Sequence, residues 1–256
     1  MDTIDLASRV HVFSELGQLG AAAAARAAEL IKRAVQERGI CTVMLAAAPS
    51  QSPLLDALVQ HAEVPWQQVH FFHMDEYVGL PPDTPQLFSR WLRSRLDGLP
   101  YGSFSAFRSD AGDPAAEAGR YAGELEKAGL LDITLLGVGV NGHLAFNEPG
   151  QTDLDDPLAV RLVDLETASR RQQVDDGLFA SLDQVPQQAL TVTVPALLRT
   201  RACLLSALGP AKAAAVGDML LGPVSPDCPA SAIRTHPNAH VYLNADAATR
   251  LDRMTL

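Results

Sequence analysis

Short apolar runs alternate along this chain with longer amphipathic stretches. Runs of β-branched and aromatic residues bounded by turn residues predict buried strands, and Ala- and Leu-rich stretches with helical periodicity predict helices. The predicted strands are residues 41–48, 69–74, 104–107, 132–138, 189–194, 201–208 and 240–243. The predicted helices are residues 14–38, 53–62, 86–96, 114–128, 166–175 and 211–221.

The order of these elements indicates the class of fold. Strands that alternate with helices from one end of the chain to the other are typical of α/β proteins. We therefore expect a three-layer, mostly parallel, Rossmann-like sheet with helices on both faces. No internal repeat or linker is evident, so residues 1–256 are expected to form a single domain. In such folds, ligands bind at the carboxyl ends of the strands.

Composition and charge narrow the range of partners. With 47% hydrophobic and 20% charged residues, the chain can bury a sizeable core. A net charge of −10 argues against nucleic acid as a partner, because binding its backbone requires a basic face. No apolar run approaches the roughly 18 residues that a membrane span needs. The three cysteines are an odd number without metal-ligand spacing, which fits a reducing, cytoplasmic setting.

The loop after predicted strand 132–138 carries the strongest candidate chemistry. Glycines such as Gly137 and Gly139 interrupt it, and glycine allows the backbone to approach a ligand closely. The loop also presents Asn141, His143 and Glu148. A histidine with a carboxylate five residues further on can support acid–base chemistry near neutral pH. The same residues would also suit a plain strand–turn–helix junction with a surface histidine.

Two acidic residues follow another predicted strand. Asp75 and Glu76 come directly after the apolar run 69–74, so we expect them at the same edge of the sheet as His143. Adjacent residues in an extended chain point in opposite directions, so one of the two should face the site. Acidic residues are also common in ordinary loops, which is the alternative interpretation.

Two further positions could hold an anion. The turn Ser50-Gln51-Ser52 precedes a predicted helix, where backbone N–H groups and hydroxyls can cradle a phosphate. Lys212 lies in the first turn of another predicted helix, where its charge opposes the helix dipole and indicates an anionic ligand. An ordinary capped turn and a solvated lysine are the alternatives. No His, Asp or Glu cluster has metal-ligand spacing, so no metal is expected.

Taken together, these stretches resemble the glucosamine-6-phosphate deaminase (isomerase) family. Residues 74–80, MDEYVGL, look like its first signature, and residues 137–149, GVGVNGHLAFNEP, look like its second. The order and separation of the two stretches also agree with the family, and the resemblance spans nearly the whole chain. The related 6-phosphogluconolactonases share the Gly-His core but usually lack the Phe-Asn-Glu-Pro continuation.

The resemblance implies a mechanism without a cofactor. His143 would open the sugar ring, Glu148 would orient His143, and Asp75 would move a proton from C2 to C1 of an amino-sugar phosphate. Release of ammonia from glucosamine 6-phosphate and water would then leave fructose 6-phosphate. Asn141 stands where many members carry Asp, and it would orient His143 by hydrogen bonding.

The resemblance also implies a set of substrate-binding residues. They are Ser50, Gln51, Ser52, Glu76, Gly137, Gly139, Ala145, Arg171, Gln173 and Lys212. The turn at residues 48–52 lacks the Gly and Thr typical of the family, and the family's lid arginine falls at Gln173, with Arg171 nearby. A phosphate held without arginine would be bound more weakly.

These departures leave other functions open. The alternatives are an isomerase or deaminase of a different sugar or sugar phosphate, a lactone hydrolase, and a non-catalytic binder of sugar phosphates. The expected partner is in each case a small molecule rather than nucleic acid or a membrane. The family includes monomers and hexamers, so a homo-oligomer is compatible with the resemblance.

Overall fold

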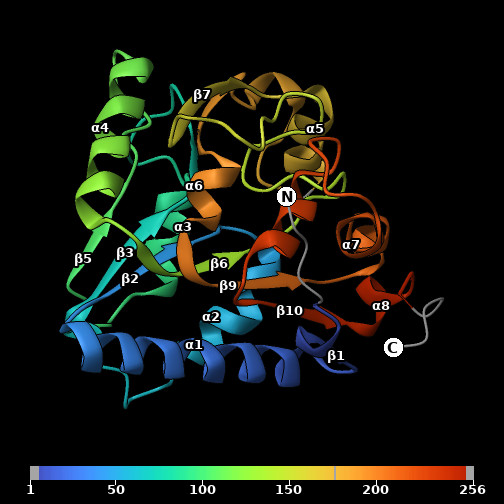
Figure 1. Cartoon of the computed structure of the whole chain (residues 1–256). Coiled ribbons are helices and arrows are strands. Elements are labelled where there is room, and N and C mark those ends of the chain that lie inside the picture. The colour runs from blue at the N-terminus through green and yellow to red at the C-terminus, as the bar shows by residue number, and fades with distance from the viewer. Residues whose placement is uncertain (1–5, 176, 252–256) are drawn as a thin grey trace.

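The computed structural model describes residues 6–175 and 177–251, so residues 1–5, 176 and 252–256 of the expected domain lie outside the described chain. A seven-stranded sheet of order β1-β10-β9-β6-β2-β3-β5 forms its centre (Figure 1). All of its strand pairs are parallel, as predicted. The strands are β1 Val10–Phe13, β2 Cys41–Leu45, β3 Val69–His73, β5 Ser103–Ser105, β6 Leu131–Leu136, β9 Thr200–Ala207 and β10 Ala239–Asn244.

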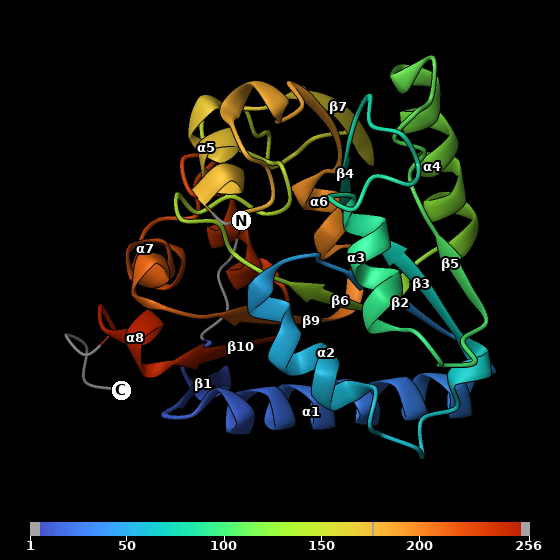
Figure 2. The ribbon, with the colours of Figure 1, turned by 180° about the vertical axis from the view of Figure 1, so that it is seen from behind.

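Helices cover both faces of this sheet, which confirms the predicted three-layer fold. The helices are α1 Leu16–Arg38, α2 Ser52–Leu58, α3 Phe88–Arg95, α4 Pro114–Ala128, α5 Thr167–Asp175, α6 Val194–Leu198, α7 Ala213–Leu221 and α8 Ala245–Ala248. Two apolar clusters fill the layers: α1, α2 and α3 pack on one face, and α4, α6, α7 and α8 pack on the other. Figures 1 and 2 show α1 and α2 below the sheet and α4, α6 and α7 above it.

Local sequence accounts for the long first helix. Its buried side is formed by small and aliphatic residues at helical spacing, including Leu19, Ala23, Ala27 and Ile31. Gly39 ends the helix with φ 79°, and its N–H donates to the carbonyl of Val35. No helix in the described part of the chain is long and apolar enough to cross a bilayer.

A second, antiparallel sheet was not predicted. Its order is β4-β8-β7, formed by β4 Asp75–Tyr77, β7 Val160–Asp164 and β8 Gln188–Val192. The apolar run 189–194 was expected in the main parallel sheet, but most of it belongs to β8. Asp75 and Glu76 were expected directly after strand 69–74, at the edge of the main sheet; they follow β3 after one residue and begin β4 of the second sheet.

Candidate active site

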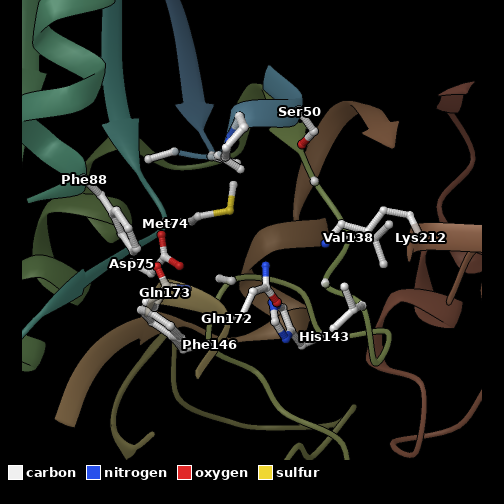
Figure 3. Close-up of a pocket in the computed structure, with 18 of the residues that line it drawn as sticks. Ser50, Met74, Asp75, Phe88, Val138, His143, Phe146, Gln172, Gln173 and Lys212 are labelled. Carbon is white, nitrogen blue, oxygen red and sulfur yellow. The ribbon is translucent and has the colours of Figure 1, made fainter. Parts of the chain in front are cut away.

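A cavity of about 400 Å³ opens at the carboxyl ends of the parallel strands. Its walls come from the segments that follow β2, β3, β6 and β9, and from α5. This is the edge at which open α/β sheets bind ligands, and the volume lies in the range of small-molecule sites. Figure 3 shows Asp75 on one side, His143 below the centre, and Ser50 and Lys212 on the opposite side.

The loop after β6 is compact because its backbone folds back on itself. The N–H of Gly139 donates to the carbonyl of His143 at 2.9 Å, and Gly142 adopts φ 88°. This fold places the imidazole of His143 directly over Gly139, where a Cβ atom would lie only 2.2 Å from Nε2. Ala145 also lines the cavity and has φ 51°, a left-handed conformation that is strained for a residue other than glycine.

A buried carboxylate stands behind His143. Oε1 of Glu148 lies 3.2 Å from Nδ1 of His143, and Oε2 accepts a hydrogen bond of 2.7 Å from Nδ2 of Asn141. Oε1 also accepts a hydrogen bond from the hydroxyl of Ser169, on α5. Burial alone would raise the pKa of Glu148, but its contacts with His143, Ser169 and Asn141 outweigh burial and lower the pKa to about 2. Glu148 is therefore a fixed anion at neutral pH.

Asn141 forms a hydrogen bond with His143, as the resemblance implied, but with its backbone. Its amide does not reach the imidazole ring of His143. Instead its Nδ2 holds Glu148, and its Oδ1 accepts a hydrogen bond of 3.2 Å from the backbone N–H of His143. Asn141 therefore orients the ring indirectly, through the carboxylate and the loop.

Asp75 faces the cavity and is 8% exposed. In Figure 3 its carboxylate lies near Phe88, Phe146 and Gln173. Burial raises the pKa of Asp75 well above its usual value, and the neighbouring charge of Glu76 raises it further. A carboxylate in this state, when ionised, is a stronger base than an exposed aspartate.

The structure corrects the expectation that Glu76 binds substrate. Glu76 is fully buried and does not line the cavity. Its carboxylate accepts hydrogen bonds from the backbone N–H groups of Tyr77, Phe88 and Ser89, at 3.1, 3.0 and 2.9 Å. It thus satisfies free backbone N–H groups at the start of α3. This agrees with the expectation that only one of the two acidic residues would face the site.

The expected anion site is partly assembled. Ser50, Gly137, Gly139 and Lys212 all line the cavity. Gln51 and Ser52 do not, which corrects the expectation for both. The side chain of Gln51 is buried and donates to the carbonyl of Leu136 at 2.8 Å, and Ser52 begins α2.

Helix α5 contributes Gln172 and Gln173 to the cavity but not Arg171. Oε1 of Gln173 accepts a hydrogen bond of 2.8 Å from the hydroxyl of Tyr77. Figure 3 places Gln173 on the side of Asp75, away from Ser50 and Lys212. The structure therefore does not support Gln173 or Arg171 as part of the anion site.

Ser169 donates a hydrogen bond to Glu148 and was not among the site residues predicted from the sequence. The stretch around it is polar on all sides, and Glu148 lies 21 residues away. α5 has little apolar periodicity, so no local pattern marked Ser169 as buried. In the described residues, no group of three or more His, Cys, Asp or Glu side chains could hold a metal ion.

The fold and the cavity define an α/β protein with acid–base groups at the carboxyl edge of a parallel sheet. The chain belongs to the family of glucosamine-6-phosphate isomerases and 6-phosphogluconolactonases, whose model matches residues 14–242. This confirms the resemblance that the two signature stretches indicated. Both activities in the family's name are enzymatic.

Individual relatives agree with this assignment. The chain is 35% identical over 246 residues to a glucosamine-6-phosphate deaminase of Rhodopirellula baltica, covering 90% of this chain and 92% of the relative. It is 34% identical over 239 residues to a glucosamine-6-phosphate deaminase of Hahella chejuensis, covering 90% of this chain and 88% of the relative.

Solved structures agree as well. A monomeric glucosamine-6-phosphate deaminase superposes with a TM-score of 0.86 at 30% identity, over 94% of this chain and 99% of that one. A 6-phosphogluconolactonase from Trypanosoma brucei superposes with a TM-score of 0.78 at 19% identity, over 94% of this chain and 98% of that one. The second likeness concerns the fold alone.

Proposed function

We propose that this protein is a glucosamine-6-phosphate deaminase that converts glucosamine 6-phosphate and water to fructose 6-phosphate and ammonia. The observation that carries the proposal is the joint exposure of His143 and Asp75 to one cavity that also receives Lys212. The names of the relatives in Rhodopirellula and Hahella support it. Because water is consumed, the overall reaction is an isomerisation coupled to a hydrolytic deamination.

His143 opens the sugar ring. Its imidazole passes a proton between the C1 hydroxyl and the ring oxygen, acting as a general acid and base. Glu148 remains ionised, since its pKa is lowered to about 2, and it stabilises the imidazolium form that arises during the transfer. Asn141 keeps Glu148 in position.

Asp75 then takes the proton from C2 of the open-chain sugar and returns a proton to C1. The buried setting that raises the pKa of Asp75 makes its carboxylate basic enough for a carbon acid. The resulting C2 imine is hydrolysed by water, which releases ammonia and leaves the C2 ketone. No cofactor is needed for these proton transfers.

The phosphate group lies against Lys212 and Ser50, across the cavity from Asp75. The ammonium group of Lys212 supplies the charge, and the hydroxyl of Ser50 supplies a hydrogen bond. Gly137 leaves room for this end of the ligand, because a Cβ atom there would lie 3.3 Å from Oγ of Ser50. Gln173, held by Tyr77, contacts the sugar near Asp75.

We further propose that residues 1–256 act as one domain in the cytoplasm. The free cysteines Cys41, Cys203 and Cys228 support a reducing compartment. Formation of a homo-oligomer stays a prediction, to be tested by the molar mass in solution.

The test is the release of ammonia from glucosamine 6-phosphate, with fructose 6-phosphate measured in parallel. The parent should release both products in equal amounts, and His143→Ala should lose this activity. His61→Ala removes an imidazole that contacts Glu63 and not the cavity, so it should keep the parent rate. Hydrolysis of 6-phosphogluconolactone by the parent, without ammonia release from the amino sugar, would overturn the proposal.

A further inference from the structure

Two side chains approach the same oxygen atom of Glu148. Oε1 accepts a hydrogen bond from the hydroxyl of Ser169 and lies 3.2 Å from Nδ1 of His143. The other oxygen, Oε2, is held by Asn141 at 2.7 Å. Ser169 is 3% exposed and Glu148 is 2% exposed, so both side chains are shielded from bulk solvent.

The contacts of Ser169 and His143 with Oε1 differ in geometry. The hydroxyl of Ser169 makes a hydrogen bond. Nδ1 of His143 is buried at an ion-pair distance but is not aligned for a hydrogen bond, and within the described residues it has no other hydrogen-bond partner. A buried nitrogen without an aligned partner is costly, and Oε1 of Glu148 is the acceptor at hand.

We propose that Ser169 is a positioning residue that competes with His143 for Oε1 of Glu148 and thereby sets how firmly this carboxylate holds the imidazole. The inference rests on the proposed roles of His143 and Glu148. Ser169 does not line the cavity, so it acts through Glu148 and not on the substrate.

Ser169 lies on the helix that also contributes residues to the cavity wall. Gln172 and Gln173 follow Ser169 by three and four residues on α5, and residues at this spacing share one face of a helix. Both glutamines line the cavity. One face of α5 therefore contacts both the ligand space and the carboxylate behind His143.

The proposal is tested by the proton NMR resonance of Nδ1–H of His143 in the protein without substrate. The signal is identified by its loss in His143→Asn. In Ser169→Ala the competing donor is gone, so His143 should bond Oε1 more strongly and its Nδ1–H resonance should move downfield. Ser169→Thr keeps the hydroxyl and should restore the parent resonance.

Thr152 offers a matched control. Its hydroxyl donates to the backbone carbonyl of Glu148 at 2.7 Å and leaves the carboxylate untouched. Thr152→Ala therefore removes a hydroxyl contact to the same residue, and the resonance of His143 should stay at the parent position.

An unchanged or upfield resonance in Ser169→Ala would overturn the proposal, as would an equal downfield shift in Thr152→Ala. If Ser169→Ala does not fold, Ser169→Cys replaces the hydroxyl with a weaker donor of similar size and should give a smaller downfield shift. The measurement needs no turnover, so its failure is separate from a failure of the parent to release ammonia.

Discussion

Replacement of Gly139 by alanine tests whether the position of the imidazole of His143 limits catalysis. A Cβ atom at this position would lie 2.2, 2.3 and 2.4 Å from Nε2, Cε1 and Cδ2 of His143. Ordinary contact begins at 3.4 Å, so the ring would have to retreat by about 1 Å or more. The φ angle of Gly139 is outside the left-handed range, so a left-handed conformation does not add to the cost of alanine here.

The displacement sets the size of the expected effect. A shift of about 1 Å in a reacting group costs about 100-fold in rate. We therefore expect kcat/KM of Gly139→Ala for glucosamine 6-phosphate to fall by about 100-fold, or about 2.7 kcal/mol of transition-state stabilisation. The assay is the release of ammonia and fructose 6-phosphate, with circular dichroism and a thermal melt to establish that the variant is folded.

Gly119 on α4 provides the matched control. Apart from its own helix backbone and chain neighbours, no heavy atom of residues 6–175 and 177–251 lies within 4 Å of a Cβ atom built there. Gly119→Ala should keep parent activity and gain about 0.5–1 kcal/mol in stability, because glycine is unfavourable inside a helix. A folded Gly139→Ala protein with activity within about threefold of the parent would refute the reasoning.

Other perturbations address the base, the anion site and the fold. Burial and the charge of Glu76 raise the pKa of Asp75, and Asp75 acts as a base only when ionised, so kcat/KM should rise with pH through this pKa. Glu76→Gln should move the rise to lower pH, and an unchanged pH–rate profile would contradict this. Lys212→Met should raise KM for glucosamine 6-phosphate by roughly 10- to 100-fold in steady-state kinetics, because a charged hydrogen bond to the phosphate is lost. An unaltered KM would place the phosphate elsewhere. Asp132→Ala should lower the free energy of unfolding in urea by about 2–3 kcal/mol and leave kcat unchanged, because Asp132 is buried and accepts hydrogen bonds from Arg38 and from a backbone N–H of β2. Equal stability would show that these bonds contribute little.

The parallel sheet was predictable because its central strands are buried on both faces. All residues of β2 and β6 are buried, and strands buried on both faces are mostly apolar runs that stand out in a sequence. The cavity edge followed from the same strands, because parallel strands end at a common edge. The positions of Asp75 and His143 at this edge could thus be expected before the structure was known.

The second sheet could not be predicted from the sequence, for physical reasons. In β7, Val160 is buried while the rest of the strand is partly or fully exposed, so no apolar run marks it. β4 has three residues and follows β3 after Met74 alone, so the two strands look like one apolar run with an acidic end. Pairings between strands more than 100 residues apart, such as Asp75 with Thr191, leave no local trace in the sequence.

Some details of the site could not be predicted for the same reason. The hydrogen bond from Ser169 to Glu148 and that from Tyr77 to Gln173 each join segments that meet only in the folded chain. The resemblance assigned Gln173 by its place in the chain, as the counterpart of an arginine. Its orientation depends on where α5 packs, which no local pattern encodes.

The unpredicted sheet fixes the relation between the two proposed acid–base groups. β8 pairs with β4, which carries Asp75, and the same strand anchors the loop that carries His143. Oγ1 of Thr191 accepts a hydrogen bond of 3.1 Å from the backbone N–H of Phe146, and Nδ2 of Asn147 donates to the carbonyl of Val192 at 2.8 Å. Asp75 and the loop are thus connected through one strand of the second sheet, in addition to the longer path through the parallel sheet. The second sheet therefore acts as the spacer between the proposed base and the proposed ring-opening group, and two groups that act in turn on the same sugar require a fixed separation.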